Sequence, residues 1–135
     1  MRIYLAASFH RHPELREYAE TLAEHGHQST ASWIHVNKDD AVETFYKERW
    51  EHAEADLDDI CGSEVLICFS ETDGGRARGG KHFEVGYALA IGLMVIIVGT
   101  KEIIFHELPT MIVVEFFDEA LEIIDGMSYE NKTPS

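Results

Sequence analysis

The most informative stretch of this chain is Gly79-Gly80-Lys81-His82-Phe83-Glu84-Val85-Gly86-Tyr87-Ala88-Leu89-Ala90-Ile91-Gly92. An apolar segment that follows a glycine pair predicts a helix beginning at that pair. The apolar runs Glu64–Ser70 before it and Met94–Gly99 after it predict two buried strands. Strand, helix and strand in this order predict parallel strands with the helix packed on the sheet.

The rest of the chain continues this alternation. We expect further strands at Arg2–Ala6, Gln28–Trp33 and Ile112–Phe116, and helices from Pro13 to Gly26, from Asp39 to Ile60 and from Phe117 onward. The pattern predicts a single α/β domain of the flavodoxin-like or Rossmann-like kind. Its parallel sheet has about five strands, with helices on both faces. We expect this domain to span residues 1–126 and residues 127–135 to form a flexible C-terminal tail.

Composition limits the partners of the protein. The chain has 135 residues, of which 45% are hydrophobic, and a formal net charge of −14. This length supports one core, and the charge disfavours nucleic-acid polymers and anionic membranes as partners. The N-terminal residues run directly into a strand pattern and no apolar run approaches membrane length, so we expect a cytoplasmic protein. Cys61 and Cys68 are expected to be buried free thiols.

Glu84 is the first candidate for chemistry. It is predicted to lie in the first turn of its helix, beyond the carboxyl end of a strand, where α/β proteins bind ligands. The helix dipole would keep the carboxylate ionised, as a nucleophile or base requires. The alternative is an ordinary glutamate that stabilises a helix start by a few tenths of a kcal/mol.

Asp56 and the loop before Glu84 are further candidates. Asp56 belongs to an acidic group at the end of a predicted helix, and a solvated acidic face is the alternative explanation. The loop from Asp73 to Lys81 also carries Arg76 and Arg78, which suggests either an anion site or a solvated loop.

Known cofactor motifs are missing from the sequence. Neither the phosphate-binding Gly-x-x-x-x-Gly-Lys-Ser/Thr pattern nor the dinucleotide Gly-x-Gly-x-x-Gly pattern occurs, so we expect no nucleotide cofactor. The histidine pairs His10/His12 and His25/His27 are spaced by two residues, unlike helical metal sites, and we expect no metal. Among the histidines, His82 and His106 are the two that merit testing.

Three segments together resemble the nucleoside 2-deoxyribosyltransferase family, whose relatives include the 2-deoxynucleoside 5-monophosphate N-glycosidases. They are Ile3–Phe9, Ala55–Ile60 and Gly79–Ala88, and the resemblance covers roughly residues 1 to 125. It implies that Glu84 is the nucleophile and that Tyr4 orients it.

The same resemblance implies roles around the nucleophile. Asp56 is expected to act with Glu84 in holding the substrate, and Asp73 to serve the base. The topology brings Tyr4, the Ser8 loop, Asp73 and Glu84 to one sheet edge. The residues expected to line the substrate site are Ser8, Phe9, Asp73, Gly80 and His82, with Arg76 and Arg78.

The family chemistry is cleavage of an N-glycosidic bond through a covalent glutamyl-sugar intermediate, followed by transfer of the 2-deoxyribosyl group to another nucleobase. Two features depart from it: the C-terminal segment around Asn131 does not match the transferases, and the loop Ser8–Arg11 lacks the glycines of the monophosphate glycosidases. Hydrolysis of a 5-monophosphate, a non-catalytic nucleotide-binding domain and, least favoured, a phosphoacceptor domain are the alternatives. The expected partners are a small nucleoside or nucleotide, a nucleobase, and a second copy of the chain in a homodimer or larger homo-oligomer.

Overall fold

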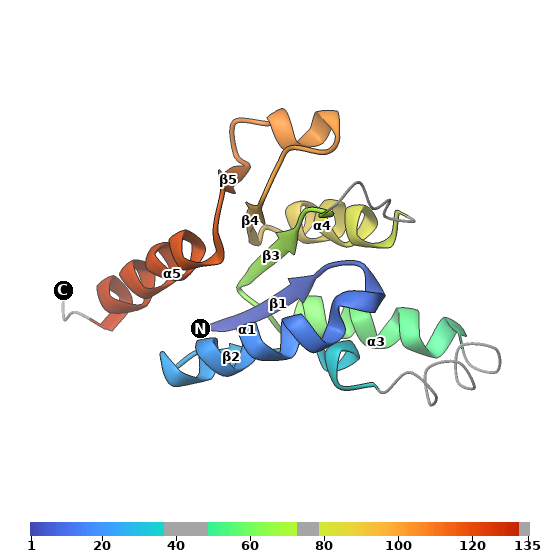
Figure 1. Cartoon of the computed structure of the whole chain (residues 1–135), viewed down its shortest axis with the longest axis horizontal. Helices are drawn as coiled ribbons and strands as arrows, with labels where there is room; N and C mark the ends of the chain where they lie inside the picture. The colour runs from blue at the N-terminus through green and yellow to red at the C-terminus, as the bar shows by residue number, and fades with distance from the viewer. Residues whose placement is uncertain (37–48, 73–78, 133–135) are drawn as a thin grey trace.

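The computed structural model describes residues 1–36, 49–72 and 79–132. Its centre is a five-stranded parallel sheet in the order β2-β1-β3-β4-β5 (Figure 1). The strands are β1 Arg2–Ala6, β2 Gln28–Ser29, β3 Val65–Phe69, β4 Met94–Val98 and β5 Ile112–Val114. This order is that of flavodoxin-like folds, so the expected single-domain α/β class is confirmed.

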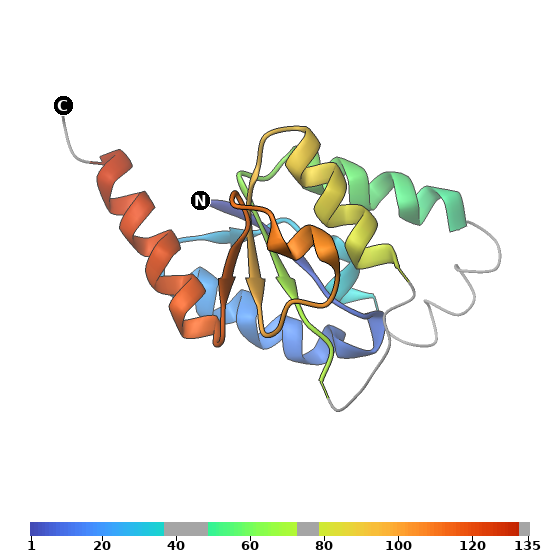
Figure 2. The ribbon, with the colours of Figure 1, turned by 90° about the horizontal axis from the view of Figure 1, so that it is seen from above.

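Helices cover both faces of the sheet. They are α1 His12–Glu24, α3 Arg49–Cys61, α4 Gly80–Ala90 and α5 Phe117–Lys132. Figure 2 shows α3 and α4 together on one side. On the other face, Tyr18 of α1 stacks on Phe69 of β3 and touches Phe117 of α5.

The core follows the alternation of side chains along the central strands. All five residues of β3 are buried, as expected for a strand with helices on both faces. Because neighbouring residues of a strand face opposite ways, Cys68 faces α4 while Phe69 faces α1. Burial raises the pKa of the Cys68 thiol to about 12, so it stays protonated.

The second strand is much shorter than the sequence pattern predicts. Pairing with β1 stops at Ser29, and Ser32–His35 form a 3-10 helix. Tertiary bonds favour this turn, because Asp59 accepts hydrogen bonds from the backbone and the hydroxyl of Ser32. The indole of Trp33 donates to the carbonyl of Leu5 at 2.9 Å.

Other boundaries also differ from the prediction. The last strand ends at Val114, and α5 continues to Lys132, so most of the expected tail is helical. The first half of the long helix expected at Asp39–Ile60 falls on residues 37–48, outside the described residues. Cys61 ends α3 and is exposed rather than buried, with its sulfur 3.2 Å from the Tyr87 hydroxyl oxygen.

Glycines shape the sheet edge where the site lies. Gly79, at φ 97°, takes the left-handed conformation immediately before α4 and so lets the helix begin at this point. Gly99, at φ 123°, follows β4, and a Cβ there would stand 2.7 Å from the Cβ of Ser70. Within the described ranges, no helix is long and apolar enough to cross a membrane.

Candidate active site

Tyr4 and Glu84 form the centre of the candidate active site. Tyr4 lies in β1 and is fully buried, and its hydroxyl donates a hydrogen bond to Oε2 of Glu84 in α4. The two residues are 80 positions apart in the sequence, and the packing of α4 on β1 brings them together. Burial and the charges of Glu84 and Asp56 raise the pKa of Tyr4, which therefore remains a hydrogen-bond donor.

The protonation of Glu84 differs from the expectation. It is the fifth residue of α4, past the first turn, and the carboxyl is largely shielded from solvent. Burial raises the pKa of Glu84 to about 7, while the hydrogen bond from Tyr4 opposes the rise and the charge of Asp56 adds to it. The helix dipole does not keep this group fully ionised, because desolvation penalises the charged form more strongly.

Asp56 approaches the pair from α3. Burial and the neighbouring charge of Asp59 raise the pKa of Asp56 to about 6, and His52 opposes the rise. Its charge acts on both Tyr4 and Glu84. Of the acidic group, Asp58 is exposed and Asp59 binds Ser32, so Asp56 is the member that turns toward the site.

A second group of polar side chains lies at the carboxyl ends of β1, β3 and β4. The Ser8 hydroxyl donates to Oε1 of Glu71, and the Lys81 ammonium donates to Oε1 of Glu102 at 2.7 Å. Lys81 also donates to the carbonyl of Phe69 at 3.0 Å, and its side chain is 1% exposed. Lys81 is therefore an internal ion-pair partner and does not offer a free cation to an anion site.

Glu71 and Glu102 were not singled out by the sequence. Each follows a strand by two to four residues, in loops that carry no recognisable motif. The one signal for them is their position beyond a strand's carboxyl end, and many loop residues share it.

Phe9 and Gly80 are the other predicted site residues that the structure describes at this edge. Phe9 is exposed and contacts the rings of His12 and Trp33, with ring centroids 5.2 and 6.1 Å away. Gly80 is the exposed first residue of α4. Asp73, Arg76 and Arg78 lie outside the described residues.

His82 lies on the flank of α4 opposite Glu84. Its ring is 5.6 Å from the ring of His106, whereas Tyr87, one turn after Glu84, contacts α3. Burial, with Lys81 nearby, lowers the pKa of His82 and favours its neutral form. The structure therefore does not bring His82 into the group formed by Tyr4, Asp56 and Glu84.

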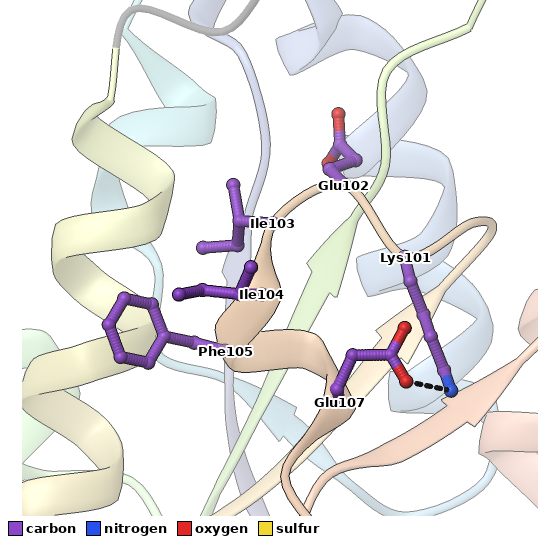
Figure 3. Close-up of a pocket in the computed structure, with 6 residues that line it drawn as sticks. All are labelled: Lys101, Glu102, Ile103, Ile104, Phe105 and Glu107. Carbon is purple, nitrogen blue, oxygen red and sulfur yellow. Dashed lines mark hydrogen bonds and ion pairs between the residues drawn. The ribbon is translucent and has the colours of Figure 1, made fainter.

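An open hollow of about 650 Å³ lies beside the loop after β4 (Figure 3). In Figure 3 the side chains of Ile103, Ile104 and Phe105 extend from this loop toward α4, and an ion pair joins Lys101 to Glu107. Tyr4, Asp56 and Glu84 are not part of its lining. The candidate site is therefore identified by its side-chain chemistry and not by this hollow.

A second hollow of about 300 Å³ lies at the carboxyl ends of β3, β4 and β5. Arg11, Phe69, Glu71 and Phe116 are among the residues that line it. Across the parts of the chain that the structure describes, no group of three or more His, Cys, Asp or Glu side chains is arranged to hold a metal ion.

Comparison with known proteins supports the fold. Neither models of protein families nor the curated proteins include a match to this chain. Among solved structures, the CMP N-glycosidase BcmB of Clostridium botulinum is similar, with a TM-score of 0.60 and 18% sequence identity. The match covers 93% of this chain and 99% of the other, so the two proteins share their fold over nearly their whole length.

Proposed function

We propose that this protein cleaves the N-glycosidic bond of a nucleoside or nucleotide, with Glu84 as the nucleophile. The observation that carries the proposal is the partly buried hydrogen bond from Tyr4 to Glu84, beside Asp56, in a sheet of the kind that binds ligands at the carboxyl ends of its strands. The fold shared with a CMP N-glycosidase supports the same chemistry.

In the proposed mechanism the two oxygens of Glu84 have separate tasks. Tyr4 binds Oε2, which fixes the carboxylate and leaves Oε1 to attack C1′ of the sugar. As the Oε1–C1′ bond forms, the C1′–N bond breaks and its electron pair leaves with the base. The departing base takes up a proton from water, and Asp56, which is charged whenever Glu84 is ionised, is the described carboxyl beside the pair that would bind the base.

The acceptor that releases the sugar from its ester with Glu84 decides between transfer and hydrolysis. We propose that a nitrogen of a second nucleobase attacks C1′, so that the ester bond breaks, the Glu84 carboxylate is regenerated and the N–H proton of the incoming base passes to water. Hydrolysis, with water as the acceptor, is the second candidate, favoured by the likeness to an N-glycosidase. Transfer requires positioning of the base, since water is present at roughly 55 M, and positioning contributes large effective concentrations.

A product assay tests both the cleavage of the N-glycosidic bond and the choice of acceptor. The protein is incubated with a panel of nucleosides and 5-monophosphates, and free base is followed by chromatography. Deoxyinosine with excess adenine should give deoxyadenosine if the enzyme transfers, and hypoxanthine with free deoxyribose if it hydrolyses. Substrate binding without any product would exclude catalysis and leave a nucleotide-binding domain.

The nucleophile is tested by Glu84→Gln and Glu84→Ala, which should lower turnover by several orders of magnitude. Glu122→Gln, at an exposed carboxylate on α5, is the control and should be fully active. Mass spectrometry of quenched reactions should find the sugar on the peptide that contains Glu84. Activity of Glu84→Ala within a few-fold of the parent would exclude the assignment.

A further inference from the structure

The edge between β1 and β3 is where this fold is expected to hold its ligand. After β1 the chain passes to α1 on one face, and after β3 it passes to α4 on the opposite face. Such a divergence creates a crevice at the carboxyl ends of the two strands. Ser8 follows β1 and Glu71 follows β3, and their hydrogen bond spans this crevice.

Glu71 is held from several sides. Its Oε1 accepts the Ser8 hydroxyl and lies 3.4 Å from the Lys81 ammonium. Its backbone N–H donates to Glu102 at 3.2 Å, and its side chain is only 5% exposed. The hydrogen bond from Ser8, together with the charge of Lys81, lowers the pKa of Glu71, so the carboxylate is ionised at neutral pH.

The crevice therefore carries an excess of negative charge. Lys81 supplies one positive charge to two carboxylates, those of Glu71 and Glu102. Arg11, the other cation at this edge in the described residues, is bound to Glu14 and to the carbonyl of Ser70. Buried charges are screened weakly by salt, so this net negative charge acts directly on a ligand bound in the crevice.

The start of α1 does not offset this charge. A helix N-terminus is normally a ready site for a phosphate. Here Glu14 already occupies the first turn of α1 with its own carboxylate. The Ser8 hydroxyl hydrogen is directed at Glu71, so toward a ligand Ser8 presents oxygen lone pairs, which accept a hydroxyl but repel a phosphate oxygen.

We propose that Glu71 is a specificity-determining residue, which excludes substrates that place a phosphate in this crevice and, through Ser8, favours those that place a hydroxyl there. The inference rests on the proposed function. The sugar over Glu84 lies near enough for this effect, because Lys81 precedes Glu84 by three residues, or about 4.5 Å along a helix axis.

Glu71→Gln is the informative variant. Both hydrogen bonds that the described residues give this carboxyl fall on Oε1, which the amide oxygen of glutamine can replace. The substitution removes the charge and keeps the shape. The measurement is kcat/KM for a nucleoside divided by kcat/KM for its 5-monophosphate, in the parent, in Glu71→Gln and in the control Glu122→Gln.

We expect the parent to prefer the nucleoside and Glu71→Gln to reduce that preference at least tenfold, while Glu122→Gln leaves it unchanged. Preference of the parent for the monophosphate, or a ratio unmoved by Glu71→Gln, would overturn the inference and leave the proposed function standing. Failure of the parent to cleave either substrate would instead overturn the proposed function.

Discussion

At the scale of single residues, Glu84, the proposed nucleophile, carries an energetic cost to the fold. Its pKa is raised from 4.5 to about 7 because the folded protein shields the carboxylate from water. The folded state therefore binds a proton more tightly than the unfolded chain. The stabilisation that this proton contributes is complete below 4.5, the pKa of Glu84 in the unfolded chain, and is lost as the pH rises through about 7, its pKa in the folded protein.

Glu84→Gln should stabilise the protein at pH 8 and change little at pH 5. Glutamine keeps an oxygen acceptor for the Tyr4 hydroxyl and cannot ionise, so it removes a penalty whose upper bound is on the order of 3 kcal/mol. Thermal unfolding at the two pH values measures the difference. A variant that is less stable than the parent at pH 8 would contradict the raised pKa.

The rate should depend on pH through the same group. Because the nucleophile is the ionised form, kcat/KM should rise with a midpoint near pH 7. Asp56, with a pKa of about 6, is already charged at that midpoint and raises the pKa of Glu84. Asp56→Asn should therefore move the midpoint to lower pH, besides lowering the rate.

Tyr4→Phe should move this midpoint in the opposite direction. The hydroxyl stabilises the carboxylate form of Glu84, so its loss raises the pKa of Glu84 and lowers turnover. The melting temperature measured below pH 6, where Glu84 is protonated, should change little. If Asp56→Asn and Tyr4→Phe moved the midpoint of the pH profile in the same direction, this assignment would be contradicted.

At the scale of elements, α4 carries the proposed nucleophile and is fixed to the sheet at its second residue. Lys81 bonds to the last residue of β3 and to Glu102 beyond β4. Glu84 follows after about one turn. The buried ion pairs thus set where α4 begins relative to β1, and so where Glu84 meets Tyr4.

Lys81→Met should destabilise the protein by roughly 3–5 kcal/mol, because it leaves Glu71 and Glu102 buried without their cation. Urea denaturation measures the effect. Lys101→Met is the matched control, since the ion pair of Lys101 with Glu107 is exposed and should contribute less than about 1 kcal/mol. Equal stabilities for the two variants would contradict the structural role of Lys81.

At the scale of the whole molecule, the prediction of a homo-oligomer concerns the apolar side chains on the surface. Trp50 and Phe105 are exposed apolar side chains that can supply an interface, whereas Met111 is buried in the core and cannot. Phe83, on the outer side of α4, is a further exposed aromatic residue. Exposed aromatic side chains of this kind are common in protein interfaces.

Light scattering should give a mass of at least twice the 15.3 kDa of the chain at micromolar concentration. The double substitution of Phe83 and Phe105 by Ser should shift the mass toward that of one chain, because it removes apolar contact area. Phe116→Ser, at another exposed aromatic residue, serves as the control. A single-chain mass for the parent would exclude the oligomer.

The sequence by itself determined the order of strands and helices and the class of fold. The apolar runs at β1, β3 and β4 and the glycine pair before α4 are local signals, and local signals suffice for elements buried on both sides. Adding the topology of a parallel sheet was enough to predict that Tyr4 and Glu84 share an edge, and the structure shows their hydrogen bond.

Only the tertiary structure decided the states of these side chains. The turn at Ser32–His35, the partners of Lys81 and the protonation of Glu84 all depend on residues distant in the chain. No periodicity encodes them, because desolvation and ion pairing arise from whichever groups the fold brings together. A pattern places a carboxyl group on a helix, but the packing around it sets its charge.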